Sequence, residues 1–116
     1  MLDFVGTVEA GELPDGRLIV LAHGPLDERI VTQFRDTLLP IASSDGIPVV
    51  LDLGDAHGLD ATTMLVIARA AELVHDRGEQ LLVVTRSPSV LGLLRQAGVS
   101  PLVRVFPTLA EAIRHD

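Results

Sequence analysis

The fold is decided by residues 49–84, VVLDLGDAHGLDATTMLVIARAAELVHDRGEQLLVV, where two short apolar runs enclose one long helical pattern. The first run, residues 49–53, is too short for a buried helix and too apolar for a strand with one solvent-exposed face. It therefore predicts a central strand covered on both faces. Residues 62–76 predict a helix, and residues 80–85 predict a second buried strand. A strand, a helix and a strand in this order indicate a parallel sheet.

The sequence before this unit predicts a hairpin followed by a helix. Residues 4–23 hold two strand patterns separated by Pro14, Asp15 and Gly16, which are strong turn formers. The period then changes to that of a helix with one apolar face. The residues of that face are Ile30, Val31, Phe34, Leu38 and Ile41.

The sequence after the unit predicts two more helices and a last strand. Ser87 is expected to cap a helix that starts at Pro88 and ends at Gly98, because proline has no amide hydrogen to lose in the first turn. Residues 102–106 predict the strand, and Thr108 is expected to cap a short final helix. The whole pattern predicts an α/β fold in a single domain, residues 1–116. Its open mixed β-sheet has about five strands, mostly parallel with an N-terminal antiparallel hairpin, and is flanked by about four helices.

Composition argues against several classes of function. The 116 residues include 9 Lys and Arg against 16 Asp and Glu, which gives a net charge of −7, and only 3% of them are aromatic. An acidic chain with few aromatic rings is poorly suited to bind nucleic acid. The longest apolar run, residues 18–22, is far shorter than the roughly 20 residues of a membrane span. We therefore expect no nucleic-acid partner and no membrane insertion. Because the N-terminus lacks the pattern of a secretory signal, we expect a cytoplasmic protein.

Sequence signatures of catalysis are missing. The chain has no GxGxxG after a strand, no Walker-type loop, no GxSxG elbow and no HExxH. The histidines at positions 23, 57, 75 and 115 do not stand at metal-ligand spacing, and there is no cysteine. Acidic pairs such as Asp55 and Asp60 are explained more simply by loop solvation and helix capping. We expect neither an enzyme nor a bound metal or cofactor.

Asp60 lies between the first buried strand and the long helix, which makes it the expected N-cap. Its carboxylate can accept the amide hydrogen of Thr62 or Thr63. Ala61, Thr62 and Thr63 then form the first helical turn, where free amides and the helix dipole favour negative charge, so a hydroxyl there could hold a phosphoryl group. On spacing alone, a capped helix with no further function is as good an interpretation as a functional site at the helix start. The position beyond the carboxyl end of a central strand favours a ligand or partner site, and His57 is in the same predicted loop.

This stretch resembles the signature region of the STAS domain, which is found in bacterial anti-sigma factor antagonists. The family pattern is an apolar strand ending in an LDL-type triplet, six further residues, and then Asp-Ser-Ser/Thr-Gly-Leu at the start of a helix. Residues 51–53 match the triplet, residues 54–59 match the gap and Asp60 matches the Asp. Residues 23–27, HGPLD, resemble the family's Gly-x-Leu-Asp before its first helix, and residues 87–113 resemble its C-terminal segment.

The resemblance implies a non-enzymatic module that binds a kinase-like anti-sigma factor and releases it when the first Ser of the motif is phosphorylated. This sequence carries Ala61 at that position and Thr63 at the family's Gly. A methyl group cannot accept a phosphoryl group, so the protein is expected to behave as though permanently unphosphorylated. Phosphorylation of Thr62, which aligns with the second hydroxyl, is the alternative. Successive helical residues point about 100° apart, so a kinase that recognises position 61 would find the Thr62 hydroxyl misplaced. This argues against the alternative.

The resemblance predicts a docking surface formed by the loop before the first helix and by the first turn of the Asp60 helix. Its residues are Pro25, Leu26, Asp27, His57, Asp60, Ala61, Thr62 and Thr63. The expected partner is an anti-sigma factor, a protein kinase-like ATPase, or another regulatory protein. A second interpretation is an accessory subunit that braces the ATPase of a phospholipid-transport ABC system through the same face. A third is binding of a nucleotide or small apolar ligand, although no phosphate-cradling glycine loop is present.

Overall fold

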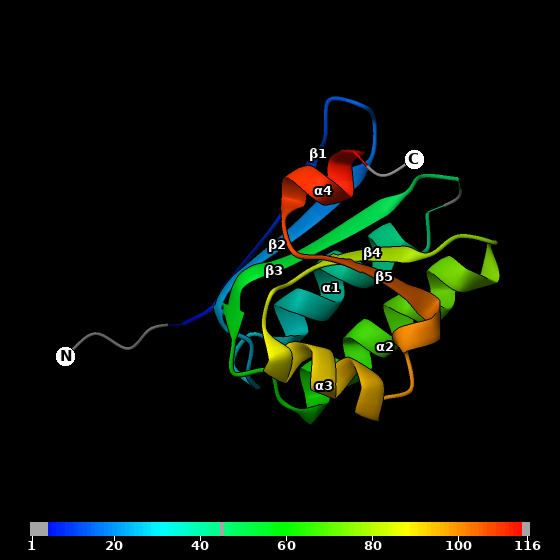
Figure 1. Ribbon diagram of the computed structural model, residues 1–116. Helices are drawn as coiled ribbons and strands as arrows, with labels where there is room; N and C mark the ends of the chain where they lie inside the picture. Colours follow the sequence, from blue (N-terminus) through cyan, green and yellow to red (C-terminus); the bar gives the residue numbers. More distant parts are fainter. Residues whose placement is uncertain (1–4, 45, 115–116) are drawn as a thin grey trace.

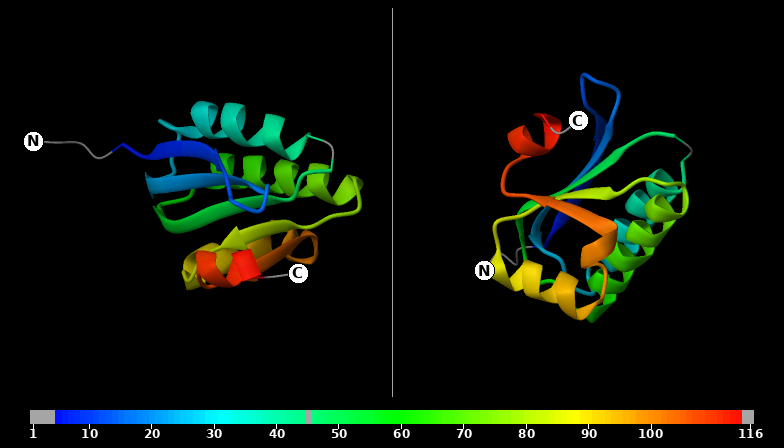
Figure 2. Two further views of the ribbon diagram at one scale, coloured as in Figure 1. Left: turned by 90° about the horizontal axis from the view of Figure 1, so that it is seen from above. Right: turned by 45° about the vertical axis from the view of Figure 1, so that its right-hand side comes forward.

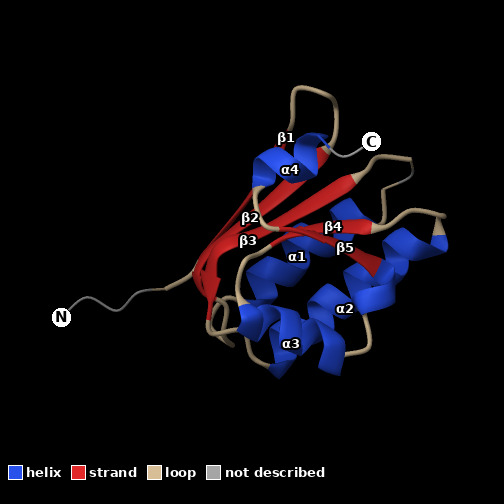
Figure 3. Cartoon of the chain, viewed as in Figure 1, coloured by secondary structure: helices blue, strands red, loops and turns tan. Residues whose placement is uncertain are grey.

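The computed structural model describes residues 5–44 and 46–114, which form alternating strands and helices (Figures 1 and 3). The strands are β1 (Thr7–Glu12), β2 (Leu18–Pro25), β3 (Val49–His57), β4 (Leu81–Val84) and β5 (Val103–Phe106). The helices are α1 (Val31–Ala42), α2 (Ala61–Asp76), α3 (Pro88–Gln96) and α4 (Leu109–Arg114), with a 3₁₀ turn, η1 (Ser100–Leu102), before β5.

The strands form one mixed sheet in the order β1-β2-β3-β4-β5. β1 and β2 are an antiparallel hairpin, and each later neighbour along the sheet is parallel, which confirms the predicted fold class. The predicted turn closes the hairpin: the Gly16 amide donates to the Leu13 carbonyl (2.9 Å), and the Leu13 amide donates to the Arg17 carbonyl (2.7 Å). The parallel strands point their carboxyl ends to one edge of the sheet, where the candidate site lies.

Helices cover the sheet unequally. α1 and α2 lie side by side against one face, and α3 contributes to the same apolar cluster (Figure 2). As predicted, the apolar side of α1 faces this cluster, with Ile30, Phe34 and Leu38 buried. The other face is covered by α4, whose Ala112 packs in a smaller cluster. The strand residues of that cluster are Ile19, Val50, Leu82 and Val84. Apolar residues on both sides of β3 and β4 explain why these strands read as continuous apolar runs.

β3 is longer than the apolar run indicates. The strand was predicted to end at residue 53, but it continues to His57, so His57 does not lie in a loop. Its polar half stays extended because it pairs with the end of β2, with Gly24 opposite Ala56 and Pro25 opposite His57. Backbone hydrogen bonding between neighbouring strands thus outweighs the loop-like sequence, and only residues 58–60 connect β3 to α2.

The other boundaries agree closely with the sequence pattern. The predicted first strand included Phe4, which lies outside the described residues, and β1 begins at Thr7. The two caps predicted after β4 are present: the Ser87 hydroxyl accepts the Val90 amide (3.2 Å), and the Thr108 hydroxyl accepts the Glu111 amide (3.2 Å).

Candidate protein-docking site

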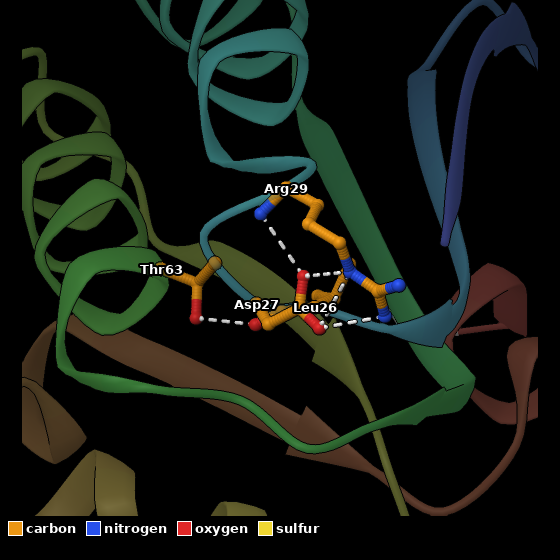
Figure 4. A network of polar contacts seen from close by, with 4 residues as sticks. All are labelled: Leu26, Asp27, Arg29 and Thr63. Atoms are coloured by element: carbon orange, nitrogen blue, oxygen red, sulfur yellow. Dashed lines mark hydrogen bonds and ion pairs between the residues drawn. The ribbon is translucent and has the colours of Figure 1, made fainter. Parts of the chain in front are cut away.

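Two connecting segments meet at the carboxyl edge of the sheet: the β2–α1 loop and the short β3–α2 connection. The amide of Leu26 donates to the carbonyl of His57 (2.8 Å), which joins the start of the first loop to the end of β3. The hydroxyl of Thr63, in the first turn of α2, lies 3.1 Å from the carbonyl oxygen of Leu26 (Figure 4). The topology therefore brings together residues that are more than thirty positions apart in the sequence.

The tip of α2 is held by a reciprocal cap. The Asp60 carboxylate accepts the Thr63 amide (3.0 Å), as one of the two sequence-based alternatives predicted, and the Asp60 amide donates to the Thr63 hydroxyl (3.1 Å). The Thr62 hydroxyl also donates to the Asp60 carboxylate, at 2.6 Å. The Thr62 hydroxyl and the Thr63 amide favour the ionised carboxylate and hold the pKa of Asp60 below its usual value. The tip is held by several hydrogen bonds and carries a negative charge at its end.

A second carboxylate lies on the neighbouring loop. Asp27 forms an ion pair with Arg29, with 2.9 Å between the guanidinium nitrogen and the carboxylate oxygen (Figure 4). The Arg29 amide also donates to the same carboxylate (3.0 Å). These bonds to the Arg29 side chain and backbone lower the pKa of Asp27, while the nearby charge of Asp60 acts in the opposite direction. The Asp27 carboxylate is therefore fixed in place close to that of Asp60.

Glycine allows the backbone to approach closely around Pro25. Gly6 is buried beneath this residue, and a Cβ atom at position 6 would overlap the Pro25 carbonyl oxygen. Gly58, which links β3 to α2, has a φ of +63°, a conformation that residues with a side chain rarely adopt. Gly6 thus lets the N-terminal segment approach the backbone of β2, and Gly58 allows the tight connection between β3 and α2 beside Pro25.

The predicted site residues divide into an exposed and a buried group. Ala61, Thr62 and His57 are exposed, and Pro25, Asp27 and Asp60 are partly exposed. Leu26 and Thr63 are fully buried, so their side chains do not belong to the surface that a partner meets. That part of the expectation is corrected: the Leu26 side chain belongs to the core, and the Thr63 side chain supports the loop from inside.

A groove between α2 and α3 was missed by the sequence reasoning. It starts at Ala61, has a volume of about 390 Å³ and has a mainly apolar lining. The apolar lining residues are Leu59, Ala61, Met64, Leu65, Ala68, Leu93 and Ala97. Leu65 is 70% exposed, although it lies in the middle of a helix that packs on the core. The spacing of positions 61, 65 and 68, which places them on one side of a helix, was the available signal.

No group of three or more potential metal-ligating side chains occurs within residues 5–44 and 46–114. Within this part of the chain, His23 lies 3.6 Å from Asp55 as a pair, and His115 is outside it. None of the helices in the described residues is long and apolar enough to cross a membrane.

Residues 9–112 match the STAS domain family, which is most of the chain, so the chain belongs to this family. No curated protein is significantly similar to it in sequence.

The fold is similar to those of solved anti-sigma factor antagonists. One from Mycobacterium paratuberculosis is 21% identical, with 94% of this chain and 92% of that chain covered and a TM-score of 0.78. The Bacillus protein SpoIIAA in its unphosphorylated form is 15% identical, with 92% and 93% covered and a TM-score of 0.73. A STAS domain antagonist from Rhodobacter sphaeroides is 22% identical, with 68% and 85% covered and a TM-score of 0.55. At these identities the likeness establishes the fold.

Proposed function

We propose that this STAS protein is an anti-sigma factor antagonist that acts by binding a bacterial anti-sigma factor and performs no chemistry of its own. The observation that carries the proposal is the tip of α2, a rigid and exposed helix start at the carboxyl edge of the sheet. Similar folds belong to proteins described as anti-sigma factor antagonists. The proposal places the protein in the cytoplasm.

The tip offers no readily available phosphate acceptor. Ala61 is exposed at the position where the family motif has its first Ser, but it has no hydroxyl group. The Thr62 hydroxyl is exposed and donates to the Asp60 carboxylate at 2.6 Å, but it points about 100° around the helix from position 61, where the family motif has its first Ser. The Thr63 hydroxyl is fully buried, out of reach of a kinase. We infer that the protein remains in its binding-competent state when an anti-sigma kinase and ATP are present.

The apolar groove supports a protein partner. Contiguous exposed apolar surface commonly marks an interaction site, and Leu65 and Ala61 place such surface directly beside the helix tip. The partly exposed carboxylate of Asp60 lines the groove, and that of Asp27 is close enough to Asp60 to feel its charge. We propose that an apolar segment of the anti-sigma factor fills the groove and that the loop carrying Asp27 contributes to the rim of the interface.

The test is to mix the purified protein with the kinase-like anti-sigma factor encoded near its gene, in the presence of ATP and Mg²⁺. We expect a stable complex by size-exclusion chromatography. We also expect that the intact mass of this chain does not increase by the mass of a phosphoryl group, about 80 Da. Phosphorylation of Thr62 or Thr63 that releases the partner would overturn the constitutive state. Absence of any complex would overturn the proposed partner.

A matched pair of variants locates the interface. Leu65→Ala removes exposed apolar surface from the proposed groove, whereas Ile113→Ala removes it from α4, which packs on the opposite face of the sheet. Leu65→Ala is expected to weaken the complex and Ile113→Ala to leave it unchanged. The reverse result would place the interface on the α4 side.

A further inference from the structure

We propose that Thr63 is a positioning residue, whose buried hydroxyl clasps the β2–α1 loop to the first turn of α2 and so preforms the docking surface. The Thr63 clasp consists of the Thr63 hydroxyl, the Leu26 carbonyl and the Asp60 amide. This inference rests on the proposed docking function and assigns a role to a residue that does not itself reach the surface.

The burial of Thr63 requires a hydrogen-bonding role. Within residues 5–44 and 46–114, Thr63 and Thr85 are the buried polar residues, and the Thr63 side chain is fully inaccessible. A buried hydroxyl is costly unless its hydrogen-bonding capacity is used. The Thr63 oxygen accepts the Asp60 amide at 3.1 Å, so its acceptor side is used within the helix cap.

The single proton of this hydroxyl is best used on the β2–α1 loop. It lies within reach of the Leu26 carbonyl (3.1 Å), the Asp60 carbonyl (3.0 Å) and the Asp60 carboxylate (3.2 Å). The same carboxylate oxygen already accepts the Thr63 amide and the Thr62 hydroxyl. The Asp60 carbonyl already accepts the Met64 amide as the first hydrogen bond of the helix (3.0 Å). Donation to Leu26 therefore satisfies one more buried carbonyl.

Leu26 transmits this anchoring to the exposed part of the loop. Its amide donates to the His57 carbonyl, its carbonyl accepts the Thr63 hydroxyl, and its side chain is fully buried. The backbone is thus fixed on both sides of one residue. The flanking residues Pro25 and Asp27, which are partly exposed, take their positions from this anchor. Figure 4 shows Asp27 beside Leu26.

The clasp lowers the cost of binding. A loop that is already ordered loses little conformational freedom when a partner docks, which favours affinity. Glycine, the residue of the family pattern at this position, has no hydroxyl and could not form the clasp. Together with Ala61, which cannot be switched by phosphate, Thr63 gives this chain a docking surface of fixed shape.

Amide hydrogen exchange of the isolated protein tests the clasp without a partner. We compare wild type with Thr63→Val, which keeps the shape and loses the hydroxyl, and Thr63→Ser, which keeps the hydroxyl. Thr85→Val is the matched control, because Thr85 is also buried and its hydroxyl accepts the Ser87 amide (3.1 Å) before α3. Exchange is followed for the protected amides of Leu26 and Ile30, neither of which bonds to Thr63.

In Thr63→Val, these two loop amides are expected to exchange about tenfold faster, because the loss of one net hydrogen bond makes local opening easier by about that factor. Thr63→Ser is expected to restore wild-type exchange, and Thr85→Val to leave the loop unchanged. Unchanged loop exchange in Thr63→Val would overturn the clasp. So would an equal increase in the amides of β4, because Thr63 would then be an ordinary core residue. A protein that shows the clasp but binds no anti-sigma factor would refute the proposed function alone.

Discussion

Replacing Asp60 with Ala is the most direct test of how the α2 tip is built. The substitution removes the carboxylate that accepts the Thr63 amide at 3.0 Å and the Thr62 hydroxyl at 2.6 Å. The Thr63 hydroxyl can still accept the backbone amide of residue 60, which needs no side chain. The variant therefore loses one half of the reciprocal cap and keeps the other.

The expected loss of stability follows from the cap. Loss of an N-cap carboxylate costs about 1 to 2 kcal/mol. Unfolding entropy near the midpoint is about 2.1 cal/mol/K per residue, so about 0.24 kcal/mol/K for a chain of this length. The melting temperature should fall by about 4 to 8 °C.

The loss should depend on pH. The folded state lowers the pKa of Asp60, chiefly through the Thr62 hydroxyl and the Thr63 amide. The stability that comes from the ionised carboxylate is then fully present above the usual pKa of about 3.9 and disappears as the pH falls through the lower folded-state pKa. The difference between wild type and Asp60→Ala should be constant from pH 7 to pH 5 and should shrink at pH 3 and below.

Urea unfolding followed by circular dichroism at pH 7, pH 5 and pH 3 measures both effects. Asp76→Ala is the control, because Asp76 is the last residue of the same helix, where a negative charge is unfavourable. This control should be neutral or slightly stabilising. Equal destabilisation by both substitutions at pH 7, or an Asp60→Ala loss that does not change at low pH, would refute the capping argument.

Three further substitutions test the site and its support. Ala61→Ser should place a phosphate acceptor at an exposed helix start, so the kinase-like anti-sigma factor should add one phosphoryl group to this variant. The anti-sigma factor should then release the variant, because the phosphoryl group brings about −1.5 to −2 charges into an apolar interface. Intact mass and chromatography check this, and a stable complex of the phosphorylated variant would contradict it. Leu65→Ala removes about three methyl-sized groups worth about 0.8 kcal/mol each, and 70% of this side chain is available to a partner. The binding free energy should therefore fall by about 1.7 kcal/mol, which is a roughly 15- to 20-fold loss of affinity by calorimetry. The melting temperature should change little. Gly6→Ala should lower the free energy of unfolding in urea by about 1 to 3 kcal/mol, because its Cβ would overlap the Pro25 carbonyl. Gly92→Ala in α3, where a Cβ meets nothing within 4 Å, should raise it by about 0.5 to 1 kcal/mol. Equal effects of the two substitutions would contradict the packing around Gly6.

Features that depend on near neighbours in the chain could be predicted from the sequence. The order of strands and helices follows from apolar spacing, and the caps at Asp60, Ser87 and Thr108 follow from short polar side chains before helical patterns. These features are formed within three or four residues of the chain, so a single sequence contains the whole interaction. The candidate position at the helix start was also predicted this way, because a cap beyond a buried strand is a local pattern, whereas the loop residues 25–27 came from the resemblance to the STAS family.

Features that depend on distant neighbours were decided by the tertiary structure. His57 belongs to β3 because the end of β2 lies alongside to pair with it. Thr63 and Leu26 are buried because α2 and the β2–α1 loop close over each other. Leu65 is exposed beside α3, although its neighbours in α2 are buried. The sequence by itself determined which elements form and where the helix tip begins. Only packing decided which side chains of that tip face solvent, since exposure depends on what other segments cover.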